Sequence, residues 1–135
     1  MTSHAHGVDA DIQDEENIYE SCKWLKEMAL NLGCVVVCSG KVDVITDGNE
    51  VNLISNGCEM LSRITGTGCM LNVAIATFLA SYSPLLACVK ATCYYEVAAE
   101  KTECSGPGTF HMHFMDEIYK LTSFDESLFK IEVLG

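Results

Sequence analysis

The sequence is poor in positive charge. Its 135 residues hold 8 Lys and Arg against 19 Asp and Glu, so the net charge is −11 at pH 7. Proteins that bind nucleic acids or anionic membranes do so through clustered Lys and Arg, because these side chains neutralise phosphate groups. We therefore expect no nucleic acid and no membrane surface among the partners of this chain.

Long apolar segments are also missing. The apolar run after Cys69 is interrupted by Asn72 and Thr77 and ends at residues 81–84. It is therefore too short for a membrane-spanning helix, which needs about 20 apolar residues. No secretory leader pattern occurs near the first residue, so we expect a cytoplasmic protein.

The cysteines lack the spacing of a metal or disulfide framework. There are eight of them, and no two form a Cys-x-x-Cys pair. Cys34 and Cys38 share an apolar run, and Cys88 and Cys93 share a helical segment. We expect most of them to be small buried thiols in a reducing compartment, and we assign no metal ligand.

The apolar content of 49% is typical of one globular domain with a modest core. Residues 1–10 have no periodicity and are expected to be mobile, with His4 and His6 part of a frayed terminus; residues 11–135 form the domain. A helix is predicted over residues 14–32, because apolar residues recur there every three or four positions: Ile18, Cys22, Leu25, Ala29 and Leu32. Trp24 is expected to widen this buried face, and Gly33 to end the helix.

Three strands are predicted next. Residues 34–38 are apolar and β-branched, which is typical of a parallel strand covered on both faces. Residues 42–46 and 51–55 flank the turn signal Asp47-Gly48 and predict a hairpin at the edge of the sheet. Ser39 follows the first strand, at the sheet edge where α/β proteins bind ligands. Its hydroxyl either contacts a nucleotide phosphate or only closes the turn.

Helices dominate the remainder of the chain. Residues 70–80 are apolar on nearly all sides and predict a buried central helix. Ser83-Pro84 predicts a second helix, which continues to about Glu103. Thr109 is expected to cap a third helix with an apolar stripe, Phe110, Phe114, Ile118 and Leu121, that leaves His111 and His113 in solvent. A closing strand is predicted over residues 128–134. These elements together indicate an α/β fold.

The segment from Gly66 to Cys69 is the strongest candidate for a binding site. Two glycines precede an apolar helix, so the backbone N–H groups of Thr67, Gly68 and Cys69 are expected to converge at the helix N-terminus. That arrangement favours an anion, phosphate above all. The alternative is a simple connecting turn, because Gly-x-Gly by itself is a weak signal.

Three motifs around this segment carry a family resemblance: Ile54-Ser55-Asn56-Gly57, Arg63-Ile64-Thr65-Gly66-Thr67-Gly68-Cys69-Met70-Leu71 and Gly106-Pro107-Gly108-Thr109-Phe110. They resemble the hydroxyethylthiazole kinases of thiamine biosynthesis, which are ribokinase-like phosphotransferases. The resemblance extends from Gly7 to about Leu121 and covers only the C-terminal half of that family's chain. It implies part of a three-layer ribokinase-like fold, with a central sheet, a β-hairpin edge and covering helices.

The resemblance also implies roles for individual residues. Ser39, Thr67 and Gly68 would bind ATP phosphates, and Gly66 would approach the thiazole alcohol. Cys69 would accept the proton of that alcohol or chiefly orient it. The acids associated with Mg²⁺ in the family lie in its N-terminal half, and its members form trimers with the thiazole site at the subunit interface. Two hypotheses follow: an ATP-dependent thiazole kinase that is incomplete in this chain alone, or an inactive fragment that serves as a folding or assembly module.

Overall fold

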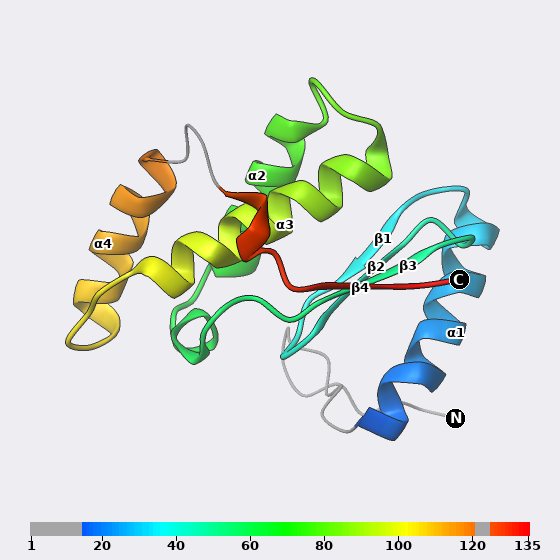
Figure 1. Ribbon diagram of the computed structural model, residues 1–135, viewed down its shortest axis with the longest axis horizontal. Coiled ribbons are helices and arrows are strands. Elements are labelled where there is room, and N and C mark those ends of the chain that lie inside the picture. Colours follow the sequence, from blue (N-terminus) through cyan, green and yellow to red (C-terminus); the bar gives the residue numbers. More distant parts are fainter. Residues whose placement is uncertain (1–14, 121–124) are drawn as a thin grey trace. The chain divides into compact units, whose positions relative to one another are not determined.

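The computed structural model describes residues 15–120 and 125–135 (Figure 1). The segment 1–10, Asp14 and Leu121, for which the sequence carries predictions, lie outside these residues. The chain divides into two compact units, one made of Met1–Ser55 with Ile131–Gly135 and one of Asn56–Lys130. The second unit is thus inserted between two segments of the first.

The first unit is a four-stranded sheet with one helix. Its elements are α1 (Glu15–Leu32), β1 (Val36–Cys38), β2 (Asp43–Thr46), β3 (Val51–Ile54) and β4 (Ile131–Leu134). The strands lie in the order β1-β2-β3-β4, and every neighbouring pair is antiparallel. Helix α1 packs on the sheet through a shared apolar core, which consists of Cys22, Leu25, Val44, Val51 and Leu53.

Two expectations about the sheet need correction. The strand after Gly33 is antiparallel to its neighbour, because the short turn from β1 to β2 has no room for a parallel crossover. This strand is also only half-buried. The hairpin β2–β3 forms as predicted, yet its strands are the inner ones of this sheet. Strand β1 covers one side of the hairpin, and β4, within the predicted segment 128–134, covers the other.

Helix α1 lies where its periodicity predicts it, with Cys22, Leu25 and Ala29 buried. Trp24 and Leu32 do not extend that face, since they are 60% and 65% exposed. The helix faces a sheet on one side only, which leaves the flanks of the stripe in solvent. Gly33 ends the helix with a φ of 63°, the left-handed conformation expected of a residue just beyond a helix.

The second unit is helical. It contains η1 (Glu59–Arg63), α2 (Thr67–Phe78), α3 (Pro84–Lys101), α4 (Pro107–Tyr119) and η2 (Glu126–Leu128). Most of its buried residues lie on α3. Helix α2 was expected to be buried on all sides, but its buried residues are Leu71 and Ile75, and Val73 is 68% exposed. Its apolar composition therefore exceeds what this unit covers.

Helix α4 begins slightly earlier than predicted. Its N-cap is Gly106, and Thr109 lies in the first turn, where its hydroxyl accepts the N–H groups of Ser105 and Gly106 at 3.0 and 3.2 Å. Thr109 thus caps the start of the helix from a position in its first turn. Phe110 and Phe114 are buried as expected, and His111 and His113 are exposed.

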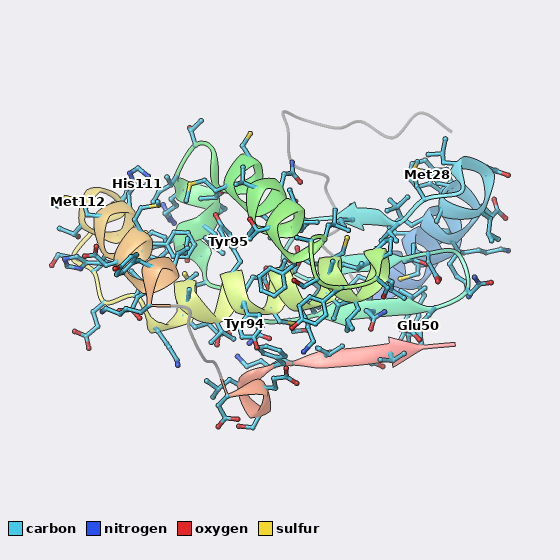
Figure 2. The ribbon with its side chains drawn as sticks, turned by 90° about the horizontal axis from the view of Figure 1, so that it is seen from above. Met28, Glu50, Tyr94, Tyr95, His111 and Met112 are labelled. Carbon is cyan, nitrogen blue, oxygen red and sulfur yellow. The ribbon has the colours of Figure 1, made fainter. Side chains whose placement is uncertain are left out.

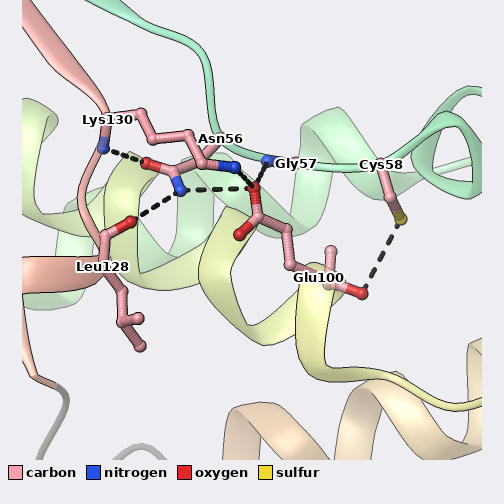
Figure 3. A network of polar contacts seen from close by, with 7 residues as sticks. Asn56, Gly57, Cys58, Glu100, Leu128 and Lys130 are labelled. Atoms are coloured by element: carbon pink, nitrogen blue, oxygen red, sulfur yellow. Dashed lines mark hydrogen bonds and ion pairs between the residues drawn. The ribbon is translucent and has the colours of Figure 1, made fainter.

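A polar network joins three distant segments of the second unit (Figure 3). The Asn56 amide donates to Leu128 O at 3.0 Å and to Glu100 Oε1 at 3.3 Å, and it accepts the N–H of Lys130 at 2.7 Å. Glu100 also accepts the Gly57 N–H at 3.1 Å and pairs with Lys130 Nζ at 2.8 Å. The network holds the loop at residues 56–57 to α3 and to the segment after η2.

Candidate active site

The candidate site is the start of α2. Gly66 is the N-cap residue, with a φ of 96°, and the first bond within the helix runs from Met70 N–H to Gly66 O at 2.9 Å. The N–H groups of Thr67, Gly68 and Cys69 precede that bond, so the helix supplies them with no acceptor. They form the partial positive end of the helix dipole.

Glycine is explained differently at the two glycine positions of this turn, Gly66 and Gly68. Gly66 needs its freedom because its φ is positive. Gly68 has no such φ, and a Cβ built on it would meet nothing within 4 Å. Neither backbone conformation nor packing within the chain therefore requires glycine at position 68. A ligand that approaches the backbone at this point would require it.

Thr67 uses its side chain within the protein. Its hydroxyl donates to Leu61 O at 2.9 Å, with Ile64 O at 3.4 Å. The side chain therefore holds the start of α2 to η1 and to the C-cap residue Ile64. Only the backbone N–H of Thr67 is left for the phosphate contact that the sequence predicted.

Cys69 lies in the first turn of α2 and is exposed. Arg63, the cation nearest to the turn in sequence, pairs with Glu59 on η1. The turn thus presents backbone donors and a thiol on the surface of the second unit. That combination suits binding of an anion beside a group able to receive a proton.

Sequence reasoning missed Tyr95, which contacts the backbone at the start of α2. Its hydroxyl donates to Thr67 O at 2.8 Å, and its ring packs edge-on against Phe114 at 4.9 Å. Burial, and secondarily the Glu96 carboxylate, raise the pKa of Tyr95. In the sequence Tyr95 is one aromatic residue in an apolar helix, and no local signal marks its hydroxyl.

The structure brings four of the five predicted site residues together, in the turn from Gly66 to Cys69. Ser39 belongs to the other unit, where it is exposed after β1. The turn beside it is closed by Asp43 Oδ1, which accepts the Gly40 N–H at 2.8 Å. Within residues 15–120 and 125–135, no three His, Cys, Asp or Glu side chains are arranged to hold a metal ion. The same residues include no helix with the length and apolar character needed to cross a bilayer.

Comparison with known proteins identifies the family. The model of the hydroxyethylthiazole kinase family matches residues 1–124. The chain belongs to this family. The hydroxyethylthiazole kinase of Pyrococcus furiosus is 40% identical over 131 residues, which are 95% of this chain and 48% of the relative. Hydroxyethylthiazole kinase 2 of Clostridium botulinum strain 657 is 37% identical over 126 residues, 90% of this chain and 48% of the relative.

A solved structure confirms the fold. The hydroxyethylthiazole kinase protein of Pyrococcus horikoshii OT3 matches with a TM-score of 0.80 and 31% identity, over 90% of this chain and 49% of that one. The family resemblance and the partial ribokinase-like α/β fold class expected from the motifs are thus confirmed. This chain spans about half the length of the hydroxyethylthiazole kinases it matches.

Proposed function

We propose that this chain supplies the phosphate-binding turn of a kinase that transfers a phosphoryl group from ATP to the hydroxyethyl group of 4-methyl-5-(2-hydroxyethyl)thiazole. The observation that carries the proposal is the start of α2 in a member of this family. Three backbone donors without helical acceptors, an exposed thiol and open space at Gly66 and Gly68 lie in one turn. Phosphoryl transfer depends mainly on groups that position the reactants and on groups that stabilise charge.

Each residue of the turn has a role in this proposal. The N–H groups of Thr67, Gly68 and Cys69 bind phosphate oxygens and stabilise the charge that spreads over them during transfer. The thiazole alcohol approaches along the open side of Gly66. Its oxygen bonds to the γ-phosphorus as the bond to the ADP oxygen breaks, and Cys69 orients the hydroxyl and receives its proton.

The remaining parts of the proposal rest on the resemblance. Ser39 contacts an ATP phosphate, and acids of the other half of the family fold hold Mg²⁺, whose charge offsets that of the phosphates. The working protein is a cytoplasmic homotrimer with the thiazole site at the subunit interface. In this arrangement the described residues bind and orient the reactants, and catalysis needs the sequence that this chain does not contain.

An inactive folding or assembly module is the second candidate function. Exposed apolar side chains on α2 and at its C-cap favour it, with Val73 68% and Leu79 46% exposed. Such residues on a helix are suited to cover by another polypeptide segment. The two functions differ in whether nucleotide and thiazole bind, so one experiment separates them.

The experiment combines this chain with the separately produced other half of the Pyrococcus furiosus relative and measures thiazole phosphate by ³¹P NMR. We expect thiazole-dependent product from the mixture and little from the chain alone, with Gly68→Val inactive because its side chain blocks the phosphate. Both halves of the relative serve as the positive control. If that control is active while this chain yields no product in the mixture, the kinase proposal is overturned.

Binding provides a readout that does not require turnover. We expect ATP to slow alkylation of Cys69 in the mixture, whereas the exposed Cys34 and Cys104 react at unchanged rates. Equal protection of all three thiols, or of none, would contradict the placement of ATP at this turn.

A further inference from the structure

Tyr95 reaches the candidate site from a different helix of the same unit. It lies on α3, is 4% exposed, and donates its hydroxyl hydrogen to Thr67 O at 2.8 Å. In Figure 2 its side chain lies between α3 and the start of α2. A buried phenol of this kind normally finds a hydrogen-bond partner. Here the partner is the backbone that immediately precedes Gly68.

The geometry of the peptide bond gives this contact a consequence. The carbonyl of Thr67 and the N–H of Gly68 belong to one planar unit and point in opposite directions. A donor that fixes the carbonyl therefore also fixes the direction of the Gly68 N–H. The hydrogen bond polarises the same peptide and strengthens its N–H as a donor.

The surroundings make Tyr95 a rigid support. The centroid of its ring lies 4.9 Å from that of Phe114, with an interplanar angle of 78°. Phe114 in turn stacks on Phe110, with ring centroids 5.3 Å apart. The Thr67 hydroxyl secures the other side of the turn through Leu61 O. Because burial raises the pKa of Tyr95, its hydroxyl keeps its proton and remains a donor at neutral and mildly alkaline pH.

We propose that Tyr95 is a positioning residue of the phosphate-binding turn, which aims the Gly68 N–H at bound phosphate by holding the Thr67 carbonyl. The inference rests on the proposed function and extends it to a residue that touches no substrate. It predicts that the Tyr95 hydroxyl affects phosphate and ATP affinity but not thiazole affinity.

The test compares Tyr95→Phe with Tyr94→Phe. Both variants remove one hydroxyl from neighbouring positions of α3, but the Tyr94 ring packs on Phe78 and Phe129. Inorganic phosphate is titrated into each ¹⁵N-labelled chain while the Gly68 amide is followed by NMR. In the mixture with the other half, KM is measured for ATP and for the thiazole.

We expect Tyr95→Phe to weaken phosphate binding and to raise KM for ATP about 3- to 10-fold, the value of one hydrogen bond. The KM for thiazole and all constants of Tyr94→Phe should stay within about twofold of wild type. A folded Tyr95→Phe protein with wild-type phosphate affinity would show that Tyr95 only packs, which overturns this inference and leaves the proposed function intact. If phosphate did not shift the Gly68 amide signal of the wild-type chain, this inference and the proposed function would both be overturned.

A measurement on the wild-type chain covers the case in which Tyr95→Phe does not fold. With ¹³C-labelled tyrosine, phosphate should shift the Tyr95 ring signal together with the Gly68 amide, because both ends of one peptide respond. A Gly68 shift without a Tyr95 shift would contradict the coupling.

Discussion

Lys130 donates its backbone N–H to Asn56 Oδ1 at 2.7 Å, across 74 positions of sequence. The same Asn56 side chain donates to Leu128 O at 3.0 Å. An amide offers acceptor and donor at once, so it can satisfy both the N–H and the C=O of an irregular segment. Asn56 therefore substitutes for a strand partner where the chain leaves η2.

Asn56→Ala should lower the free energy of unfolding by about 2–3 kcal/mol, because it leaves two backbone groups without partners at a site that is 6% exposed. Urea denaturation measures the change. Asn31→Ala, at an exposed position of α1, is the control and should stay within about 0.5 kcal/mol. Equal effects of the two substitutions would show that the Asn56 network does not stabilise the fold.

Gly48→Ala should destabilise the chain more than Gly33→Ala. Both glycines have positive φ values, 95° and 63°, so alanine costs about 1–2 kcal/mol at each. A Cβ at Gly48 would also lie 2.5 Å from Leu30 Cγ and 3.1 Å from Leu30 N, whereas one at Gly33 meets nothing within 4 Å. We expect a further loss of about 1–3 kcal/mol at Gly48, measured as the difference between the two thermal unfolding curves. Identical curves would mean that α1 moves away without cost.

Cys69→Ala should reduce thiazole phosphorylation by the mixed halves about 10²- to 10⁴-fold, the usual contribution of a positioned acid or base. Cys69→Asp should retain activity, since a carboxylate at the same place can accept the proton. Cys104→Ala, at another exposed thiol, is the control. If Cys69→Ala turned over like wild type, the backbone donors alone would account for catalysis.

Stability should fall at alkaline pH. Burial raises the pKa of the Cys22 and Cys38 thiols, and the Asp43 carboxylate adds to the effect on Cys38. Above the ordinary thiol pKa of 9.0, the unfolded chain loses protons that the folded chain retains, so the free energy of unfolding decreases as pH rises. Below that pH both the folded and the unfolded chain keep these thiols protonated, so the thiols add no pH dependence to the free energy of unfolding.

The measurement is the urea midpoint between pH 7 and 10.5. A variant with Cys22→Ala and Cys38→Ala should have a shallower alkaline slope, whereas Cys34→Ala, at an exposed thiol, should keep the wild-type slope. Other groups that titrate in this range are common to all three proteins and cancel in the comparison. A slope unchanged by the double substitution would assign the alkaline loss to those other groups.

Local signals in the sequence were enough to predict α1, the hairpin β2–β3 and α3, because a periodic stripe, an Asp-Gly turn and a Ser-Pro start are each properties of a few neighbouring residues. The exposure of Trp24 and Val73 was mispredicted, since an apolar side chain does not reveal which segment covers it. The pairing of β1 depended on a turn too short for a crossover. In each of these cases the deciding partner lies outside the local pattern.

The candidate site likewise has features that the local sequence predicts and features that depend on distant segments. The Gly-x-Gly segment and the apolar run behind it located the start of α2. The inward turn of the Thr67 hydroxyl and the approach of Tyr95, 28 positions later, depend on tertiary packing. The roles assigned to Ser39, Gly66, Thr67, Gly68 and Cys69 remain predictions.

The pairing of β3 with β4 has a consequence for synthesis on the ribosome. Val51 pairs with Leu134, so the second neighbour of β3 emerges only after the whole of the inserted helical unit has been translated. Until then β3 presents an unpaired edge, the kind of surface on which nascent chains associate wrongly. Completion of the sheet is therefore a late, non-local step, which slows folding. Nascent chains released before residues 131–134 are made would keep that edge open and be the form most in need of a chaperone.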